Sequence, residues 1–203
     1  MSAVGMRLAV VGVTLAFALP AGAGGAEAEG RLREANDRLR ELLAGTPDAA
    51  DVGRVVDGLL DYEGLSRRAL SNHWTRLTAA QRDEFLATFH KLVEKSYKEN
   101  LKETLDNIAI DYLGWEDIQE GNVLVRTLVR KIRTRRSRRA QTAIVYEMTL
   151  VGDVWKVIDV ITDDVSLVQS YRDQFNSIIG RAASFDAGWA DLMSRMRRKL
   201  EGD

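Results

Sequence analysis

The spacing of apolar residues changes twice along this chain, and these changes constrain its fold more than any other feature. From Thr78 to Asn107, large apolar residues recur at steps of three and four, which is typical of one face of an α-helix. Over residues 108–161 they alternate with other residues, as in half-buried β-strands. Helical spacing returns near Ser166. Helices, then strands, then helices predict an α+β fold with helices packed on one face of an antiparallel sheet.

The longest predicted element is a helix over residues 79–105, about 40 Å long at 1.5 Å per residue. Thr78 and Gln81 fit a capping box, in which the threonine hydroxyl and the glutamine amide satisfy the first free N–H groups. Shorter helices are expected at residues 31–44, 52–60 and 65–70, from residue 164 or 166 onward, and after a cap at Ser184.

The alternating segments predict a meander of four antiparallel strands, or slightly more, which is strongly curved if it wraps a helix. Gly121-Asn122 and Gly152-Asp153 are typical turn residues between such strands. The strands are expected around residues 108–112, 123–129, 144–150 and 155–161.

The first residues predict an export signal. Arg7 precedes an apolar run over residues 8–19, and Pro20 ends that run. Ala21-Gly22-Ala23 then supplies small residues at the −3 and −1 positions of a cleavage site. The run is about 12 residues long, which is shorter than the roughly 20 residues that a membrane-spanning helix needs. A cleaved signal is therefore expected, with an uncleaved anchor as the alternative.

We expect residues 1–23 to be removed, or residues up to Ala28 if the second small-residue site at residues 26–28 is used. Residues 29–203 are then expected to form a single domain in the periplasm, since that length suffices for one sizeable core. The chain has no cysteine, which excludes a disulfide framework and a lipoprotein attachment site. Its net charge of −1 argues against generic nucleic-acid binding.

No motif of a known catalytic class is present. The sequence has no G-x-S-x-G elbow, P-loop, H-E-x-x-H pair or dinucleotide-binding glycine fingerprint. His73 and His90 are its two histidines, and neither has an evident catalytic partner. Asp163 and Asp164 precede a predicted helix and are expected to cap it and to interact with its dipole. We therefore expect no enzyme activity, no cofactor and no bound metal.

Positive charge gathers in one stretch of the predicted meander. This stretch can be a solvated hairpin tip, a contact for lipid phosphate or an anionic membrane, or a docking site for an acidic protein. Its basic residues are Arg126, Arg130, Lys131, Arg133, Arg135, Arg136, Arg138 and Arg139.

Two parts of the chain resemble the MlaC family, which is also called the toluene-tolerance family. The first runs from Leu70-Ser-Asn-His73-Trp74 through the segment LTAAQRDEF at residues 77–85. The second is WKVIDV at residues 155–160, followed by VSLVQSYRDQF at residues 165–175. The resemblance extends in order over nearly the whole expected mature chain, and the export signal agrees with it.

The resemblance implies an apolar cavity between the helices and the curved sheet, with phospholipid tails inside and headgroups near solvent. It implies a periplasmic shuttle in a system that maintains outer-membrane lipid asymmetry. The implied partners are an inner-membrane ABC transporter complex and an outer-membrane lipoprotein complex. Family relatives also occur beside hopanoid synthesis and efflux systems. The basic stretch is longer than the usual strand connection, which leaves the lipid and the docking partner open.

Periodicity alone favours an ordinary filled core, and it is the resemblance that suggests that apolar side chains line a cavity. The alternatives are a carrier of another apolar ligand, such as a hopanoid or a solvent, and a periplasmic adaptor that carries nothing. The expected lining residues are Phe85, Phe89, Leu92, Val93, Tyr97, Val125, Val129, Tyr146, Met148, Val157, Val168, Tyr171 and Phe175. The expected headgroup, membrane or partner contacts are Arg133, Arg135, Arg136, Arg138, Arg139 and Arg172, the last of which can instead pair with a surface carboxylate.

Overall fold

The computed structural model describes residues 23–45, 48–105, 108–118, 121–131 and 141–202. The expected signal segment therefore lies outside the described residues, apart from its last position, Ala23. The helices are α1 (Ala23–Leu43), α2 (Ala49–Leu59), α3 (Tyr62–Leu70), the 3-10 helix η1 (Ser71–Arg76), α4 (Ala79–Leu105), α5 (Leu167–Gly180) and α6 (Phe185–Glu201).

The start of α4 confirms the predicted capping box. The Thr78 backbone N–H donates to Gln81 Oε1 at 2.9 Å, and the Gln81 N–H donates to Thr78 Oγ1 at 3.2 Å. Ser184 caps α6 as expected, because its side chain accepts from the Ala187 N–H. Helix α1, in contrast, begins eight positions before the predicted residue 31, at Ala23.

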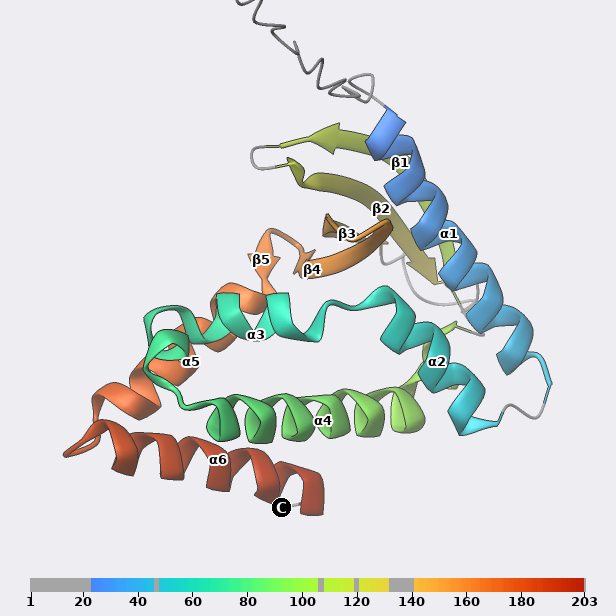
Figure 1. Cartoon of the computed structure of the whole chain (residues 1–203). Helices are drawn as coiled ribbons and strands as arrows, with labels where there is room; N and C mark the ends of the chain where they lie inside the picture. The colour runs from blue at the N-terminus through green and yellow to red at the C-terminus, as the bar shows by residue number, and fades with distance from the viewer. Residues whose placement is uncertain (1–22, 46–47, 106–107, 119–120, 132–140, 203) are drawn as a thin grey trace, which may run out of the picture.

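The strands form one antiparallel sheet in the order β1-β2-β3-β4-β5, so the predicted α+β fold with a meander is confirmed. The fifth strand is a two-residue extension, within the prediction of four strands or slightly more. Figure 1 shows a curved sheet flanked by α1, with α2 and α3 below it and α4 and α6 beyond them. The strands are β1 (Ile108–Asp117), β2 (Val123–Lys131), β3 (Gln141–Val151), β4 (Val154–Thr162) and β5 (Val165–Ser166).

The connection between α2 and α3 is attached to the free edge of β4. Leu60 forms an isolated parallel bridge with Val157, and the Asp61 N–H donates to the Val157 carbonyl at 3.0 Å. This backbone pairing holds the end of α2 and the start of α3 against the sheet, while α4 lies on their other side (Figure 1). The connection therefore separates the sheet from the long helix over part of its length.

A buried carboxylate joins β4 to α5. Asp159 is 6% exposed and accepts hydrogen bonds from the Ser166 hydroxyl at 2.5 Å and from the N–H groups of Val160 and Val168. Ser166 is itself the N-cap of α5, since its side chain accepts from the Gln169 N–H. An anion at this position compensates the free N–H groups and the positive end of the helix dipole.

The expectation that Asp163 and Asp164 cap this helix is wrong. Both are exposed turn residues with positive φ angles, 47° and 66°, in the tight link between β4 and β5. Aspartate tolerates this left-handed conformation better than most residues do. The carboxylate that accepts a hydrogen bond at the start of α5 is instead that of Asp159, in β4.

The buried apolar residues form three clusters. The helical cluster lies between α3, α4, α5 and α6, and it consists of Leu65, Ala69, Leu70, Trp74, Leu77, Phe85, Val168, Phe175, Ile179, Trp189, Leu192, Met193 and Met196. The sheet cluster lies between α1 and the sheet, and it consists of Ala28, Leu32, Val123, Val125, Met148, Trp155 and Val157. The smaller α1–α2 cluster consists of Leu39, Leu43, Val52 and Ile108.

We predict that Asp159→Asn lowers the free energy of unfolding by about 2–3 kcal/mol, because an amide NH2 group then faces buried donors. Asp163→Asn is the matched control, since Asp163 is exposed and asparagine also adopts positive φ. Urea unfolding of both variants measures the difference. Equal stabilities for the two variants would contradict the anchoring role of Asp159.

Candidate functional site

The residues expected on the helix side of a cavity belong to the helical cluster. Phe85 is 1% exposed, and its ring centroid lies 5.9 Å from those of both Phe175 and Trp189. Val168 is also buried there. Four further predicted residues are only half-buried: Phe89, Leu92, Val93 and Tyr171. All of these except Val93 pack against the helical cluster from outside. Tyr97 lies in α4, and its side chain is outside the described residues.

The residues expected on the sheet side divide between the two other clusters. Val125, Met148 and Val157 are fully buried in the sheet cluster. Tyr146 is half-buried and packs against that cluster, whereas Val129 packs against the α1–α2 cluster. The predicted helix side and sheet side therefore do not meet in one continuous core.

One residue that the prediction did not include connects them. Leu60, at the β4 edge, packs against both the helical cluster and the sheet cluster. Its bridging position depends on backbone pairing with Val157, which side-chain periodicity does not reveal. The sequence had indicated only that Leu60 ends a short amphipathic helix.

Several apolar side chains at the borders of the three clusters keep solvent-accessible surface. Complete burial of such a side chain is worth about 1.5–3 kcal/mol, and these side chains gain only part of that free energy. They come from the sheet, from α2 and its end, and from α4, which are distant in sequence. We call them the apolar seam; they are Val56, Leu59, Leu60, Phe89, Leu92, Ile110, Tyr112, Val129, Tyr146 and Val160.

Two tyrosines supply the polar groups of the seam. The Asn36 Nδ2 donates to the Tyr112 hydroxyl at 2.7 Å, and the Arg33 guanidinium lies 3.8 Å from the centre of the Tyr112 ring. Burial raises the pKa of Tyr112. Burial raises the pKa of Tyr146 to about 12, and the neighbouring Tyr112 adds to this shift. Both groups are therefore neutral phenols at physiological pH.

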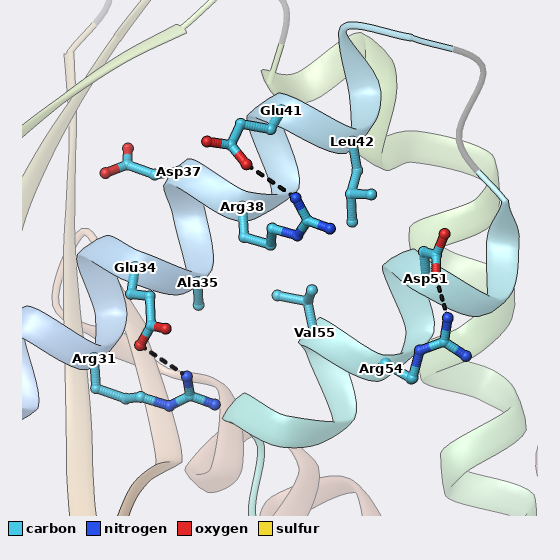
Figure 2. Close-up of a pocket in the computed structure, with 10 residues that line it drawn as sticks. All are labelled: Arg31, Glu34, Ala35, Asp37, Arg38, Glu41, Leu42, Asp51, Arg54 and Val55. Atoms are coloured by element: carbon cyan, nitrogen blue, oxygen red, sulfur yellow. Dashed lines mark hydrogen bonds and ion pairs between the residues drawn. The ribbon is translucent and has the colours of Figure 1, made fainter.

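One groove lined by described residues lies elsewhere, between α1 and α2, with a volume of about 580 Å³. Figure 2 shows its charged rim, on which Arg31 pairs with Glu34 and Arg38 pairs with Glu41. A second groove of about 490 Å³, between α5 and α6, is also lined by charged residues such as Asp173 and Arg195. Neither groove has the apolar lining that the sequence prediction requires.

Arg172 donates hydrogen bonds to a backbone carbonyl and to a glutamine side chain, in place of the surface carboxylate that was the alternative expectation. Its Nε donates to the Arg68 carbonyl at 2.9 Å, and its Nη1 donates to Gln169 Oε1 at 3.3 Å. Arg68 in turn forms two hydrogen bonds of 2.8 Å with Glu147 of β3. Arg172 thus connects α5 to α3, and α3 is bound to the sheet. The predicted contacts Arg133, Arg135, Arg136, Arg138 and Arg139 lie outside the described residues.

The histidines have structural surroundings. His73 Nε2 lies 2.9 Å from Asn176 Oδ1, and the ring stacks on Phe185. His90 Nε2 lies 2.9 Å from Asp57 Oδ1 at the surface.

In the described part of the chain, no three His, Cys, Asp or Glu side chains come together as a metal ion would require. Every described helix is too short or too polar to span a bilayer.

We predict that Phe85→Ala lowers the free energy of unfolding by about 3–5 kcal/mol, as removal of a fully buried phenylalanine does. Phe89→Ala on the same helix is expected to cost less than about 2 kcal/mol, because Phe89 is half-buried. Urea unfolding measures both. Equal losses would show that Phe89 is as much a core residue as Phe85.

Two of three comparisons with known proteins give a match. No curated protein matches the chain. Its fold is similar to that of a phospholipid-binding protein from Ralstonia solanacearum, solved in complex with a phospholipid at 1.53 Å resolution. The two chains are 18% identical, with a TM-score of 0.67 over 88% of this chain and 98% of that one, which establishes a shared fold. The sequence model of the MlaC protein family matches residues 44–197, and the chain therefore belongs to the MlaC family.

Proposed function

We propose that this protein is a periplasmic phospholipid carrier, the soluble component of an ABC lipid-transport system that works between the inner and outer membranes. The apolar seam is the observation that carries this proposal, since it leaves apolar side chains from three parts of the fold incompletely buried. Membership of the MlaC family and the phospholipid-bound Ralstonia solanacearum relative support it.

The physical task of such a carrier is to shield hydrocarbon from water. Each methylene moved out of water is worth about 0.8 kcal/mol, so the two chains of an ordinary phospholipid represent on the order of 20 kcal/mol. A free lipid therefore crosses an aqueous compartment very slowly. A protein that covers the chains with apolar side chains removes this barrier without making or breaking a covalent bond, and we propose no enzyme activity.

We place the lipid tails against the half-buried seam residues and not against the fully buried ones. Phe89, Leu92 and Tyr146 are both predicted lining residues and members of the seam. Phe85, Val125 and Met148 are covered by other protein groups and are proposed to support the lining from behind. The basic stretch is proposed to contact lipid phosphate or a partner, in particular Arg133, Arg135, Arg136, Arg138 and Arg139.

We predict that protein purified from the periplasm contains phospholipid, which organic extraction and mass spectrometry identify. A bulky side chain in the seam should exclude it, so Val160→Trp is expected to lose most of the bound lipid while its melting temperature stays close to that of the wild type. Leu113→Trp is the matched control, because Leu113 is 62% exposed.

Two results would count against the carrier. One is wild-type protein that contains no lipid and takes up none from phospholipid vesicles. The other is an equal loss of lipid in the Val160 and Leu113 variants, which would separate lipid binding from the seam. A bound hopanoid in place of phospholipid would favour the alternative of another apolar cargo.

We also propose that the export signal is cleaved after Ala23 and not after Ala28. Ala28 is fully buried in the sheet cluster, and the first turn of α1 packs closely on aromatic rings. A Cβ added at Gly25 would lie 2.0 Å from Trp115, and one added at Gly24 would lie 3.0 Å from Trp155. The first turn of α1 therefore packs against the rest of the folded domain, and we propose that it belongs to the mature protein.

N-terminal sequencing of the exported protein tests this site. We predict a mature chain that starts at Gly24, because cleavage after Ala28 would remove a buried residue from the core. A mature chain that starts at Glu29 would contradict the prediction. Retention of residues 1–23 would favour the uncleaved anchor.

A further inference from the structure

Tyr146 stands out among the residues of the apolar seam because its hydroxyl has no hydrogen-bond partner in the part of the chain that the structure describes. Its neighbours in the strand register are Val125 on β2 and Val160 on β4, so apolar residues lie beside it on both strands. Among the described residues, none forms a hydrogen bond with the Tyr146 hydroxyl. Because a phenol both donates and accepts, this hydroxyl is available for a hydrogen bond with water or with a guest.

The Tyr146 hydroxyl is also accessible. Three side-chain atoms in the described residues are both inaccessible to solvent and without a hydrogen-bond partner: Arg31 Nε, His73 Nδ1 and Trp155 Nε1. The Tyr146 oxygen also lacks a partner but is not among them, so it is accessible to solvent. The residue keeps solvent-accessible surface, although its surroundings are buried enough to raise the pKa of its phenol to about 12. The hydroxyl of this half-buried side chain is therefore available to a guest bound against the seam.

Tyr112 provides the contrast within the same seam. Its hydroxyl already accepts a hydrogen bond from Asn36, and its ring lies under Arg33. Among the seam's described side chains, only the Tyr146 hydroxyl therefore forms no hydrogen bond. A phenol that stays protonated acts at this position as a hydrogen-bond donor.

The surroundings of Tyr146 select the kind of acceptor. Burial is the main cause that raises the Tyr146 pKa, and its partners in the strand register, Val125 and Val160, are apolar. A phosphate anion brought against these residues would lose hydration, and burial of a charge is costly. A neutral carbonyl oxygen suits a neutral donor in apolar surroundings.

We infer that the Tyr146 hydroxyl donates a hydrogen bond to an ester carbonyl oxygen of a lipid bound against the apolar seam. This inference rests on the proposed function and adds a determinant of cargo selection. The contact favours ester-linked lipids over ether-linked lipids and over pure hydrocarbons of the same shape. It also fixes the depth of the lipid, with the glycerol linkage at β3 and the phosphate outside.

The test compares two probes that differ only in the linkage, diacyl and dialkyl phosphatidylglycerol with equal sixteen-carbon chains. Delipidated protein is incubated with an equimolar mixture, and native mass spectrometry measures the ratio of the two complexes. One hydrogen bond corresponds to a preference of about three- to ten-fold for the diacyl lipid in the wild type. We expect Tyr146→Phe to lower this preference to near unity and Tyr62→Phe to keep it, because Tyr62 lies outside the seam and its hydroxyl donates to Asp57.

A preference that persists in the Tyr146→Phe variant would overturn the inference, as would a wild type that binds both probes equally. Either result leaves the proposed carrier function standing, because the protein still binds lipid. A wild type that binds neither probe would instead refute the carrier function. Melting temperatures of both variants verify that each is folded.

Discussion

The arrangement of this protein depends on the backbone pairing between Leu60 and the edge of β4. This pairing occupies a sheet edge that would otherwise be open, and it directs α2 and α3 between the sheet and α4 (Figure 1). The apolar residues of the sheet and those of α4 consequently pack into separate clusters joined at Leu60. The borders between these clusters are where apolar side chains stay half-buried. The apolar seam is thus a consequence of the way the Leu60–Val157 bridge places α2 and α3 between the sheet and α4 (Figure 1).

Polar anchors hold this arrangement against collapse. Asp159 binds the start of α5 to β4, and the pair Arg68–Glu147 binds α3 to β3. Arg172 adds a contact between these two helices. Such groups are directional, whereas apolar contacts alone would permit the helices to slide toward the seam and fill it. Both anchors attach helices of the helical cluster to β3 and β4.

Local signals predicted the elements well. The capping box at Thr78 and the apolar spacing that follows it located α4, and alternation with turn residues located the four long strands. Long-range features were not predictable in this way. The role of Leu60 depends on a bridge to Val157, and the anchoring of α5 depends on Asp159 and not on the adjacent Asp163. Periodicity marks a residue as apolar, but it does not distinguish a filled core from a half-open border.

The central claim is that acyl chains lie against the apolar seam. Intermolecular NOEs between a bound phospholipid and methyl-labelled protein test it most directly, because they report proximity of individual methyl groups. The account predicts NOEs from the acyl methylene protons to the methyl groups of Leu60 and Val160, and none to those of exposed Leu113. Acyl-chain NOEs to Leu113 with none to Leu60 or Val160 would contradict it.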